Sequence, residues 1–282
     1  MKYFLLLVAI TSIILVSCSE STTNTTDPAA YTNADGIKGG ILFDKFWSTE
    51  SGYDQTNPNI TKFNASADFF RCKQCHAWDL MGRNGSYNSR GPKTNRPNIA
   101  DRNLLAIAKS KTPQQMFDGI KNGLAETRRD ISFDLSTYNP ATNPTVGDQM
   151  PKMSQLLTDD QIWNIVKFLK VEALDVTQLY DAAYTDSYPT GKAVFTNIGK
   201  DGDAAKGLIF YKTNCENCHG TDGKQIIVES MTTGKFTRSK PNEVQHKVKF
   251  GQLGSIMKAT DISLTDMKNL YKALADTVKF PN

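Results

Sequence analysis

The sequence predicts an all-α protein of two tandem domains, and three helix signals carry that prediction. Residues 158–161 (TDDQ) form a capping box, and apolar residues follow it at i, i+3, i+4 and i+7. Residues 263–266 (SLTD) begin a second helix with the same apolar offsets. Thr112 and Pro113 supply an N-cap and a first-turn proline for a third helix. Few or no strands are expected.

The composition excludes several classes of protein. The chain has 282 residues, of which 39% are hydrophobic and 22% charged, and these values suit one large or two small globular domains. They exclude a chain that is disordered throughout, a collagen-like repeat and a multi-span membrane protein. The net charge of +4 is too small to imply nucleic acid as a partner, and none is expected.

The first residues have the pattern of an export signal. Lys2 precedes an almost wholly apolar run, residues 3–16, which is too short for a comfortable transmembrane helix. Residues 15–18 (LVSC) resemble the lipobox of bacterial lipoproteins. The resemblance implies a signal peptide over residues 1–17 and a lipid on Cys18. The protein would then be an exported, membrane-anchored lipoprotein, periplasmic or associated with the outer membrane. An ordinary signal peptide with a chance cysteine is the alternative.

The rest of the chain divides into a tether and two domains. Residues 18–36 are rich in Ser, Thr and Asn and offer almost nothing to bury, so a flexible tether is expected there. Residues 37–174 are expected to form the first domain and 200–282 the second. Residues 175–199 contain aromatic side chains besides Pro and Gly, which favours a packed linker.

Two copies of one cysteine motif decide the functional interpretation. Residues 72–76 (CKQCH) and 215–219 (CENCH) are both C-x-x-C-H, the attachment signature of c-type haem. Two thiols three residues apart lie on one face of a helical turn and can both add to the haem vinyl groups. The histidine that follows can ligate the iron. The expected thioether residues are Cys72, Cys75, Cys215 and Cys218, and the expected proximal ligands are His76 and His219.

Each motif, taken alone, is also compatible with three other kinds of site. A structural disulfide, a thioredoxin-like redox pair and half of a zinc site all use paired cysteines. A redox pair needs a βαβ pattern around it, which the sequence lacks. A four-thiolate zinc site leaves both following histidines without a role.

The second motif and its surroundings resemble the class I cytochromes c. Gly207, Tyr211 and the Gly220-x-Asp222-Gly223 run match the opening helix and haem loop of that family. The first copy is looser, because Ala77 replaces the usual glycine after the histidine. The resemblance covers nearly all of the mature chain and implies a dihaem c-type cytochrome. Its cofactors would be two c-type haems, and short helices would wrap around each of them.

A methionine precedes the last helix of each domain and is the expected distal ligand. Met150 is followed by proline, which is common in the ligand loop of the family, and Met153 is its rival. Met257 lies in the corresponding loop of the second domain. His246 is either a distal ligand of the second haem, a neighbour of a propionate or, as we favour, a partly exposed side chain. The family pattern also points to Pro97 as a neighbour of the proximal histidine of the first domain, and a plain turn at Pro97 is the alternative.

The expected function is electron transfer. Haems held by His and Met would take an electron from one redox protein and pass it to another. Basic residues around the second Met loop would steer acidic partners to the domain 2 face; these are Lys235, Arg238, Lys240, Lys247, Lys249 and Lys258. The alternative is a haem enzyme, or the electron-accepting subunit of an oxidoreductase complex, with one labile axial position. A gas or redox sensor would need an output domain on a separate partner. We expect a carrier and not an enzyme.

Overall fold

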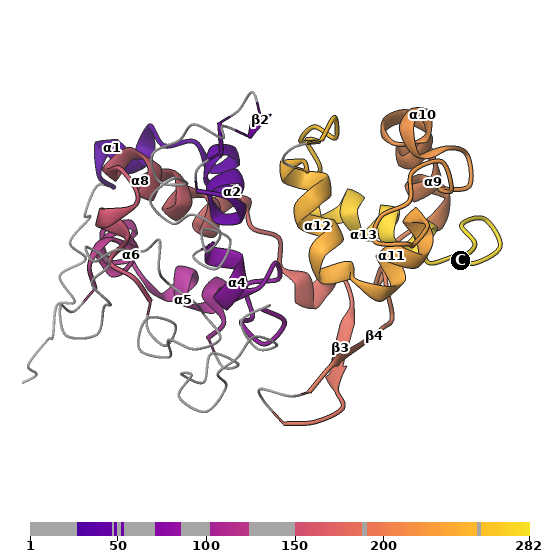
Figure 1. Ribbon diagram of the computed structural model, residues 1–282, viewed down its shortest axis with the longest axis horizontal. Coiled ribbons are helices and arrows are strands. Elements are labelled where there is room, and N and C mark those ends of the chain that lie inside the picture. Colours follow the sequence, from indigo (N-terminus) through magenta and orange to yellow (C-terminus); the bar gives the residue numbers. More distant parts are fainter. Residues whose placement is uncertain are drawn as a thin grey trace, which may run out of the picture.

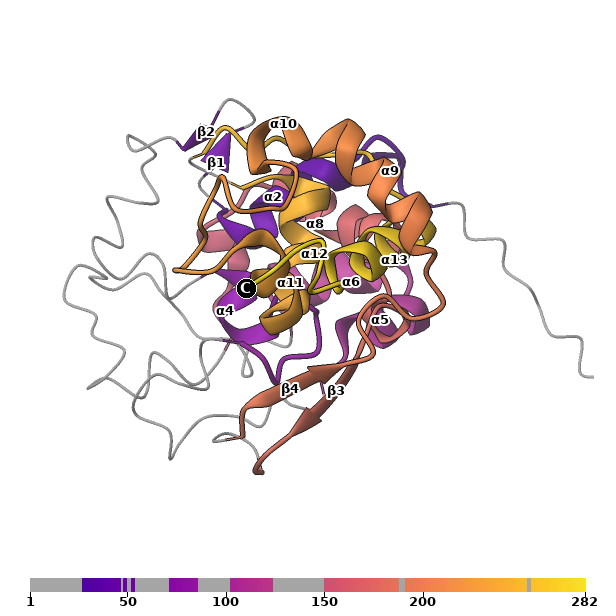
Figure 2. The ribbon, with the colours of Figure 1, turned by 90° about the vertical axis from the view of Figure 1, so that its right-hand side faces the viewer.

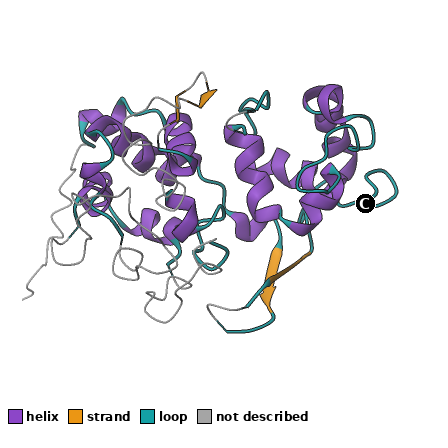
Figure 3. Ribbon diagram, in the orientation of Figure 1, coloured by secondary structure: helices purple, strands orange, loops and turns teal. Residues whose placement is uncertain are grey.

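The protein is mainly helical in the part of the chain that the structure describes. The computed structural model describes residues 27–46, 48–49, 52–53, 71–85, 102–123, 150–187, 191–252 and 255–282. Helices dominate these residues and the strands form two short hairpins, which confirms the all-α fold class (Figures 1 and 3). None of the described helices has the length and apolar character needed to cross a bilayer.

The helices form two groups that follow one another along the chain (Figure 1). The first contains α1 (Ala29–Thr32), α2 (Gly36–Asp44), a β1–β2 hairpin (Ser48–Thr49 and Gly52–Tyr53), α4 (Cys72–His76), α5 (Leu104–Ser110), α6 (Pro113–Lys121), a 3-10 turn (Met153–Gln155) and α8 (Asp159–Lys167), which continues as a π-helical turn (Phe168–Glu172). The second contains a 3-10 turn (Val176–Gln178), the antiparallel β3–β4 hairpin (Asp181–Tyr184 and Ala193–Thr196), α9 (Ala204–Asn214), α10 (Glu216–His219), α11 (Thr233–Ser239), α12 (Pro241–Phe250) and α13 (Leu264–Leu274).

The capping signals place the helix starts as the sequence predicts. Thr158 accepts a hydrogen bond from the backbone N–H of Gln161, whose side chain accepts from the backbone N–H of Thr158 in return. Thr112 begins α6 with the same reciprocal pair. Ser263 caps α13, but its hydroxyl donates to the Asp266 carboxylate, so this second box is only half formed.

The two halves repeat one helix crossing. A Cβ atom on Gly39 of α2 would lie 1.9 Å from the carbonyl oxygen of Asn164 in α8. A Cβ atom on Gly207 of α9 would lie 1.8 Å from the carbonyl oxygen of Asn269 in α13. Glycine is therefore required at both places, because the helix backbones touch there.

The same two asparagines also bind the N-termini of α2 and α9 by hydrogen bonds. The backbone N–H of Asp35 donates to the Asn164 side chain, and that of Asp203 donates to the Asn269 side chain, both at 2.8 Å. Each aspartate in turn caps its own helix by accepting from two backbone N–H groups. The crossing of α2 with α8 and the crossing of α9 with α13 therefore have the same set of contacts.

The repeat extends to the middle of each half, where the sequence repeat is poorly preserved. The backbone N–H of Leu104, which begins α5, donates to the carbonyl of Leu80 at 2.9 Å. The N–H of Thr233, which begins α11, donates to the carbonyl of Gly223 at the same distance. A proline near the start of α6 and of α12 follows in each case.

Each half has its own apolar core. The expected tether and the expected linker both contribute buried side chains to these cores. In the expected linker, Val176 and Leu179 are buried in the second core. The predicted flexible tether is wrong for the stretch that ends it. Tyr31 of α1 is 6% exposed and lies in the first core with its ring 6.3 Å from that of Trp163. This aromatic residue of a polar stretch packs α1 against α8.

Candidate functional site

The second C-x-x-C-H motif forms a tight turn at the end of α9. Cys215 ends α9, and Cys218 and His219 lie on the short helix α10. The buried hydroxyl of Tyr211 donates to the carbonyl of Gly220, 2.6 Å away, and so fixes the residue after the histidine to α9. Gly220 has a φ of 79° and a ψ of 165°, a conformation that is essentially reserved for glycine.

A small cavity opens beside this motif. Three of the residues expected to bind a haem line it together: Cys215, His219 and Met257. Aromatic and aliphatic side chains from α9, α11, α12 and α13 form most of the remaining wall. An apolar pocket with a few polar groups is typical of a cofactor site.

The imidazole of His219 is held by a hydroxyl group. Its Nδ1 lies 3.0 Å from Oγ1 of Thr233, at the start of α11. Burial lowers the pKa of His219, so the neutral form that can ligate a metal is favoured. The sequence indicated no partner for this histidine, because the family pattern points to a proline carbonyl and not to a threonine.

Met257 is presented by a loop that begins with a left-handed glycine. Gly251 ends α12 with a φ of 81° and turns the chain back. The backbone N–H of Gln252 then donates to the carbonyl of Met257 at 3.0 Å, which closes the loop. The side chain is half-buried against the second core and reaches the cavity without a following proline.

The thiols do not have the properties of a redox pair. All four motif cysteines are free of disulfides. Burial, aided by the neighbouring Cys75, raises the pKa of Cys72 to about 12. Burial, aided by Cys218, raises the pKa of Cys215 to about 11. These thiols stay protonated at neutral pH, whereas a thioredoxin-like pair needs a thiol of lowered pKa.

A bare metal ion finds no site of the usual kind among the described residues. No three side chains of His, Cys, Asp or Glu converge there. The two motifs lie on α4 and α10, in different halves of the protein (Figure 1).

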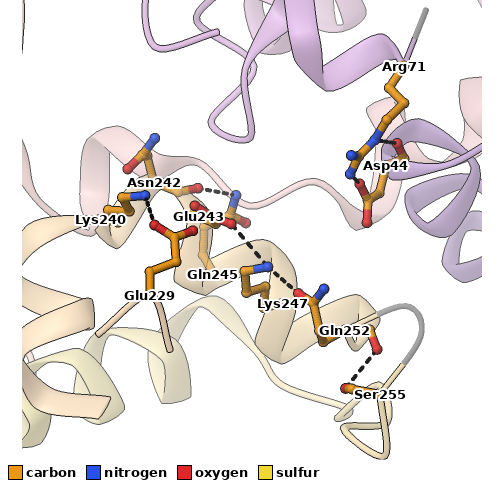
Figure 4. Close-up of polar contacts among 10 residues, drawn as sticks. All are labelled: Asp44, Arg71, Glu229, Lys240, Asn242, Glu243, Gln245, Lys247, Gln252 and Ser255. Carbon is orange, nitrogen blue, oxygen red and sulfur yellow. Dashed lines mark hydrogen bonds and ion pairs between the residues drawn. The ribbon is translucent and has the colours of Figure 1, made fainter. Parts of the chain in front are cut away.

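The first motif is anchored by a buried ion pair. Arg71 precedes α4, and its guanidinium pairs with the carboxylate of Asp44 at the end of α2, while its Nε donates to the Asp44 carbonyl at 2.6 Å (Figure 4). The Arg71 and Asp44 side chains are only 11% and 4% exposed. This pair joins the motif to α2, as the shared residue Cys215 joins α10 to α9 in the second half.

The structure places the first motif and its expected distal ligand against one core. Cys72, Cys75 and Met150 are partly buried side chains that pack against the first core. Met153 is 2% exposed and belongs to that core itself. Met150 thus resembles Met257 in its burial, and Met153 does not. Cys18 and Pro97 lie outside the described residues.

His246 does not lie where our sequence interpretation placed it. The partly exposed position that we favoured is wrong, because its side chain is 2% exposed. It does not line the cavity of the second half either. It points into the first half, where Nε2 lies 3.1 Å from the carbonyl of Gly40. A lone histidine in a basic stretch carries no signal of such an interface.

The expected basic face of the second domain is smaller than the sequence suggests. Lys249 is buried and pairs with Glu172 of the first half at 3.1 Å. Lys247 pairs with Glu243 along α12 at 3.0 Å (Figure 4). Arg238 donates to the backbone carbonyls near the C-terminus, and Lys240 pairs with Glu229. Of the six basic residues, Lys235 and Lys258 have exposed side chains and form no such pair within the described part of the chain.

No family model matches the chain, and neither a curated protein nor a solved structure is significantly similar to it.

Proposed function

We propose that the protein is a dihaem c-type cytochrome that carries electrons between redox proteins. The observation that carries the proposal is the apolar cavity of the second half, where Cys215, His219 and Met257 meet. These are the three residue types that a covalently held, six-coordinate haem requires. Such a haem supplies reversible one-electron exchange when it is bound.

The residues around the cavity have separate tasks in this proposal. Cys215, which lines the cavity, and the exposed Cys218 on α10 would hold the group by thioether bonds. Nε2 of His219 serves as one ligand. Nδ1 then carries the proton, and Oγ1 of Thr233 accepts it, which orients the ring and raises its basicity. The thioether of Met257 serves as the other ligand and favours the reduced state.

The first half holds a second group in the same way. Cys72 and Cys75 supply the thiols and His76 the proximal ligand, on a helix that the Arg71–Asp44 pair fixes to α2. Met150 is the distal ligand, because it is half-buried like Met257 whereas Met153 is part of the core. The repeated helix crossings support two sites of one kind.

A carrier fits this ligand set better than an enzyme. His219 and Met257 would both hold the iron, which would keep substrates out and keep rearrangement between the oxidation states small. The alternative is a haem enzyme, or an electron-accepting subunit of an oxidoreductase complex, in which one methionine is labile.

The partners and the location follow from the surface and from the first residues of the chain. Redox proteins with an acidic patch would meet the second site near Lys235 and Lys258, which are exposed. Lipid on Cys18 would anchor the protein to a membrane outside the cytoplasm. Labelling of the protein with a fatty acid in a bacterial host, and its loss in Cys18→Ser, tests the anchor.

Haem content and carbon monoxide binding test the function. The purified protein is expected to contain two covalently bound haems. Cys215→Ala/Cys218→Ala and Cys72→Ala/Cys75→Ala are each expected to retain one. The reduced protein is expected to show no spectral change with carbon monoxide. A change at one haem would favour the enzyme, and absence of covalent haem would refute the proposal.

A further inference from the structure

Helix α12 has two functional faces. Val244, Lys247 and Val248 line the cavity of the second half. Gln245 and His246, elsewhere on the helix surface, contact the first half. A helix with its side chains is about 10 Å across. The width of α12 therefore lies between the cavity and the contact with the first half.

The face of α12 that meets the first half centres on Trp78. Trp78 lies two residues beyond His76 and is 8% exposed. The side chain of Gln245 donates to its carbonyl at 2.7 Å. The ring of His246 lies 4.6 Å from the indole, between centroids, and the ammonium of Lys247 lies 5.3 Å from it. Lys247 therefore contacts Trp78 and lines the second cavity at once.

The contact between the halves is close-packed. A Cβ atom on Gly40 of α2 would lie 2.3 Å from the Phe250 ring, so the two helices are in direct contact. Phe250 itself belongs to the first core, with its ring 5.1 Å from that of Phe168. Lys249 adds its buried ion pair with Glu172. The views of Figures 1 and 2 agree with α12 as the element that lies against α2.

We propose that α12 is the electron path between the two sites, entered from the first site at Trp78 and leading through Lys247 and Val248 to the second. The proposal rests on the proposed haem function. One electron leaves the reduced site and enters the oxidised one, so no other reactant is consumed. Gln245 and His246 are positioning residues, since they hold the indole against the helix.

Tunnelling is the physical reason why this packing matters. Its rate falls steeply with distance and more steeply through empty space than through bonded or packed atoms. The path runs from the loop after His76 through the Trp78 ring and across one helix. No proton needs to move with the electron at His246, because burial and the charge of Lys247 lower its pKa to about 3 and keep it neutral.

The test follows a single electron inside the haem-loaded protein. Met257→His serves as a common background, since it marks the second haem by its spectrum and lowers its potential. A flash-generated reductant delivers less than one electron per molecule. Decay of reduced second haem with a matching rise of reduced first haem is then followed, and its rate is expected not to depend on protein concentration.

Three further substitutions in this background locate the path. Trp78→Leu removes the indole, and Gln245→Met removes the hydrogen bond to the backbone carbonyl of Trp78. Each is expected to slow the transfer severalfold without shifting either haem potential. Trp163→Leu removes a similarly buried indole that stacks on Phe117 and is the matched control. It is expected to leave the rate unchanged.

Two results would overturn the path, and a third has a different meaning. A rate that neither Trp78→Leu nor Gln245→Met changes would refute it, and so would transfer that occurs only between molecules. Gln245→Met decides the matter if Trp78→Leu does not fold. A wild-type protein with fewer than two covalent haems would instead refute the proposed function, and the path with it.

Discussion

The loops that follow the two C-x-x-C-H helices share a backbone but differ in sequence. In the second half, Gly220 and Gly223 take φ values of 79° and 75°. In the first half, Ala77 and Leu80 take φ values of 62° and 64° at the corresponding positions. A side chain in this region of backbone space costs about 1–3 kcal/mol, so the first loop is strained where the second is not.

The burial of the two loops explains the difference. Ala77 is fully buried and Leu80 is 2% exposed, and Trp78 between them contacts α12. The first loop therefore uses side chains because it forms part of the contact between the halves. The second loop adjoins the exposed Cys218 and keeps glycine. The first loop thus helps to form the contact between the halves, whereas the second loop lies beside an exposed cysteine.

Disruption of the shared helix crossing should lower the free energy of unfolding more than any of the other substitutions. Gly207→Val and Gly39→Val both force a side chain into the backbone of the crossing helix, at less than 2 Å from an oxygen atom. Each is expected to lower the free energy of unfolding by about 3 kcal/mol or more. Chemical denaturation of the haem-loaded protein measures this. Gly119→Ala on α6, where a Cβ atom meets nothing within 4 Å, is the control and is expected to be neutral or stabilising. An equal effect at Gly119 would contradict the argument.

The contact between the halves should make stability depend on pH. The pKa of His246 is lowered from 6.5 to about 3 by burial, with Lys247 as a second cause. Below pH 6.5 the imidazole therefore binds a proton in the unfolded chain but stays neutral in the folded protein. The contribution of His246 to the free energy of unfolding is thus fully present above pH 6.5 and is lost as the pH is lowered toward 3. One such group contributes about 1.4 kcal/mol per pH unit, or about 2 kcal/mol between pH 6.5 and 5.

His246→Gln tests this dependence. Glutamine retains a donor for the Gly40 carbonyl but cannot titrate. Unfolding free energies at pH 5 and at pH 7 should differ less in the variant than in the wild type. A variant with the wild-type difference would show that another group sets the acid sensitivity.

Local signals made much of the fold predictable. The capping boxes at Thr112 and Thr158 set helix starts that the structure confirms. The position of Met257 ahead of the last helix predicted a residue that does reach the cavity beside His219. Each of these signals lies within one helical turn or one loop of the residue that it places.

The contacts that join distant segments were not predictable. Phe250 completes a helix of the second half, yet it packs in the core of the first. Thr233 is separated from His219 by 14 positions, and a hydroxyl group at a helix start has no pattern that assigns it to an imidazole. Such contacts depend on how folded helices pack, which a periodicity in one segment does not encode.

Exchanging the residues after the two histidines tests the strain directly. Gly220→Ala should lower the free energy of unfolding by about 1–3 kcal/mol, because φ is 79° and the new Cβ would lie 3.2 Å from that of Gln225. Ala77→Gly relieves the same strain and loses one buried methyl group worth about 0.8 kcal/mol, so it should not destabilise. Denaturation of the two haem-loaded variants gives the comparison. Equal destabilisation by both would refute the assignment of strain to the first loop.

The last difference between the halves concerns the proximal histidines. Thr233 meets His219, whereas Leu104, without a hydroxyl group, begins the corresponding helix of the first half. A hydrogen bond accepted from the imidazole raises its basicity and favours the oxidised state. Thr233→Val should therefore raise the potential of the haem that we propose for the second half. The expected size is about 1 kcal/mol, which for one electron is on the order of 40 mV.

Redox titration of Thr233→Val and Thr233→Ser separates this electronic effect from packing. Serine keeps the acceptor and should keep the potential near that of the wild type, while valine keeps the shape and loses the acceptor. Leu104→Val serves as a control, since no hydroxyl group is lost there and neither potential should move by as much. If Thr233→Ser shifted the potential as far as Thr233→Val, the hydroxyl group would not be what tunes the second site, and the halves would differ in some other contact.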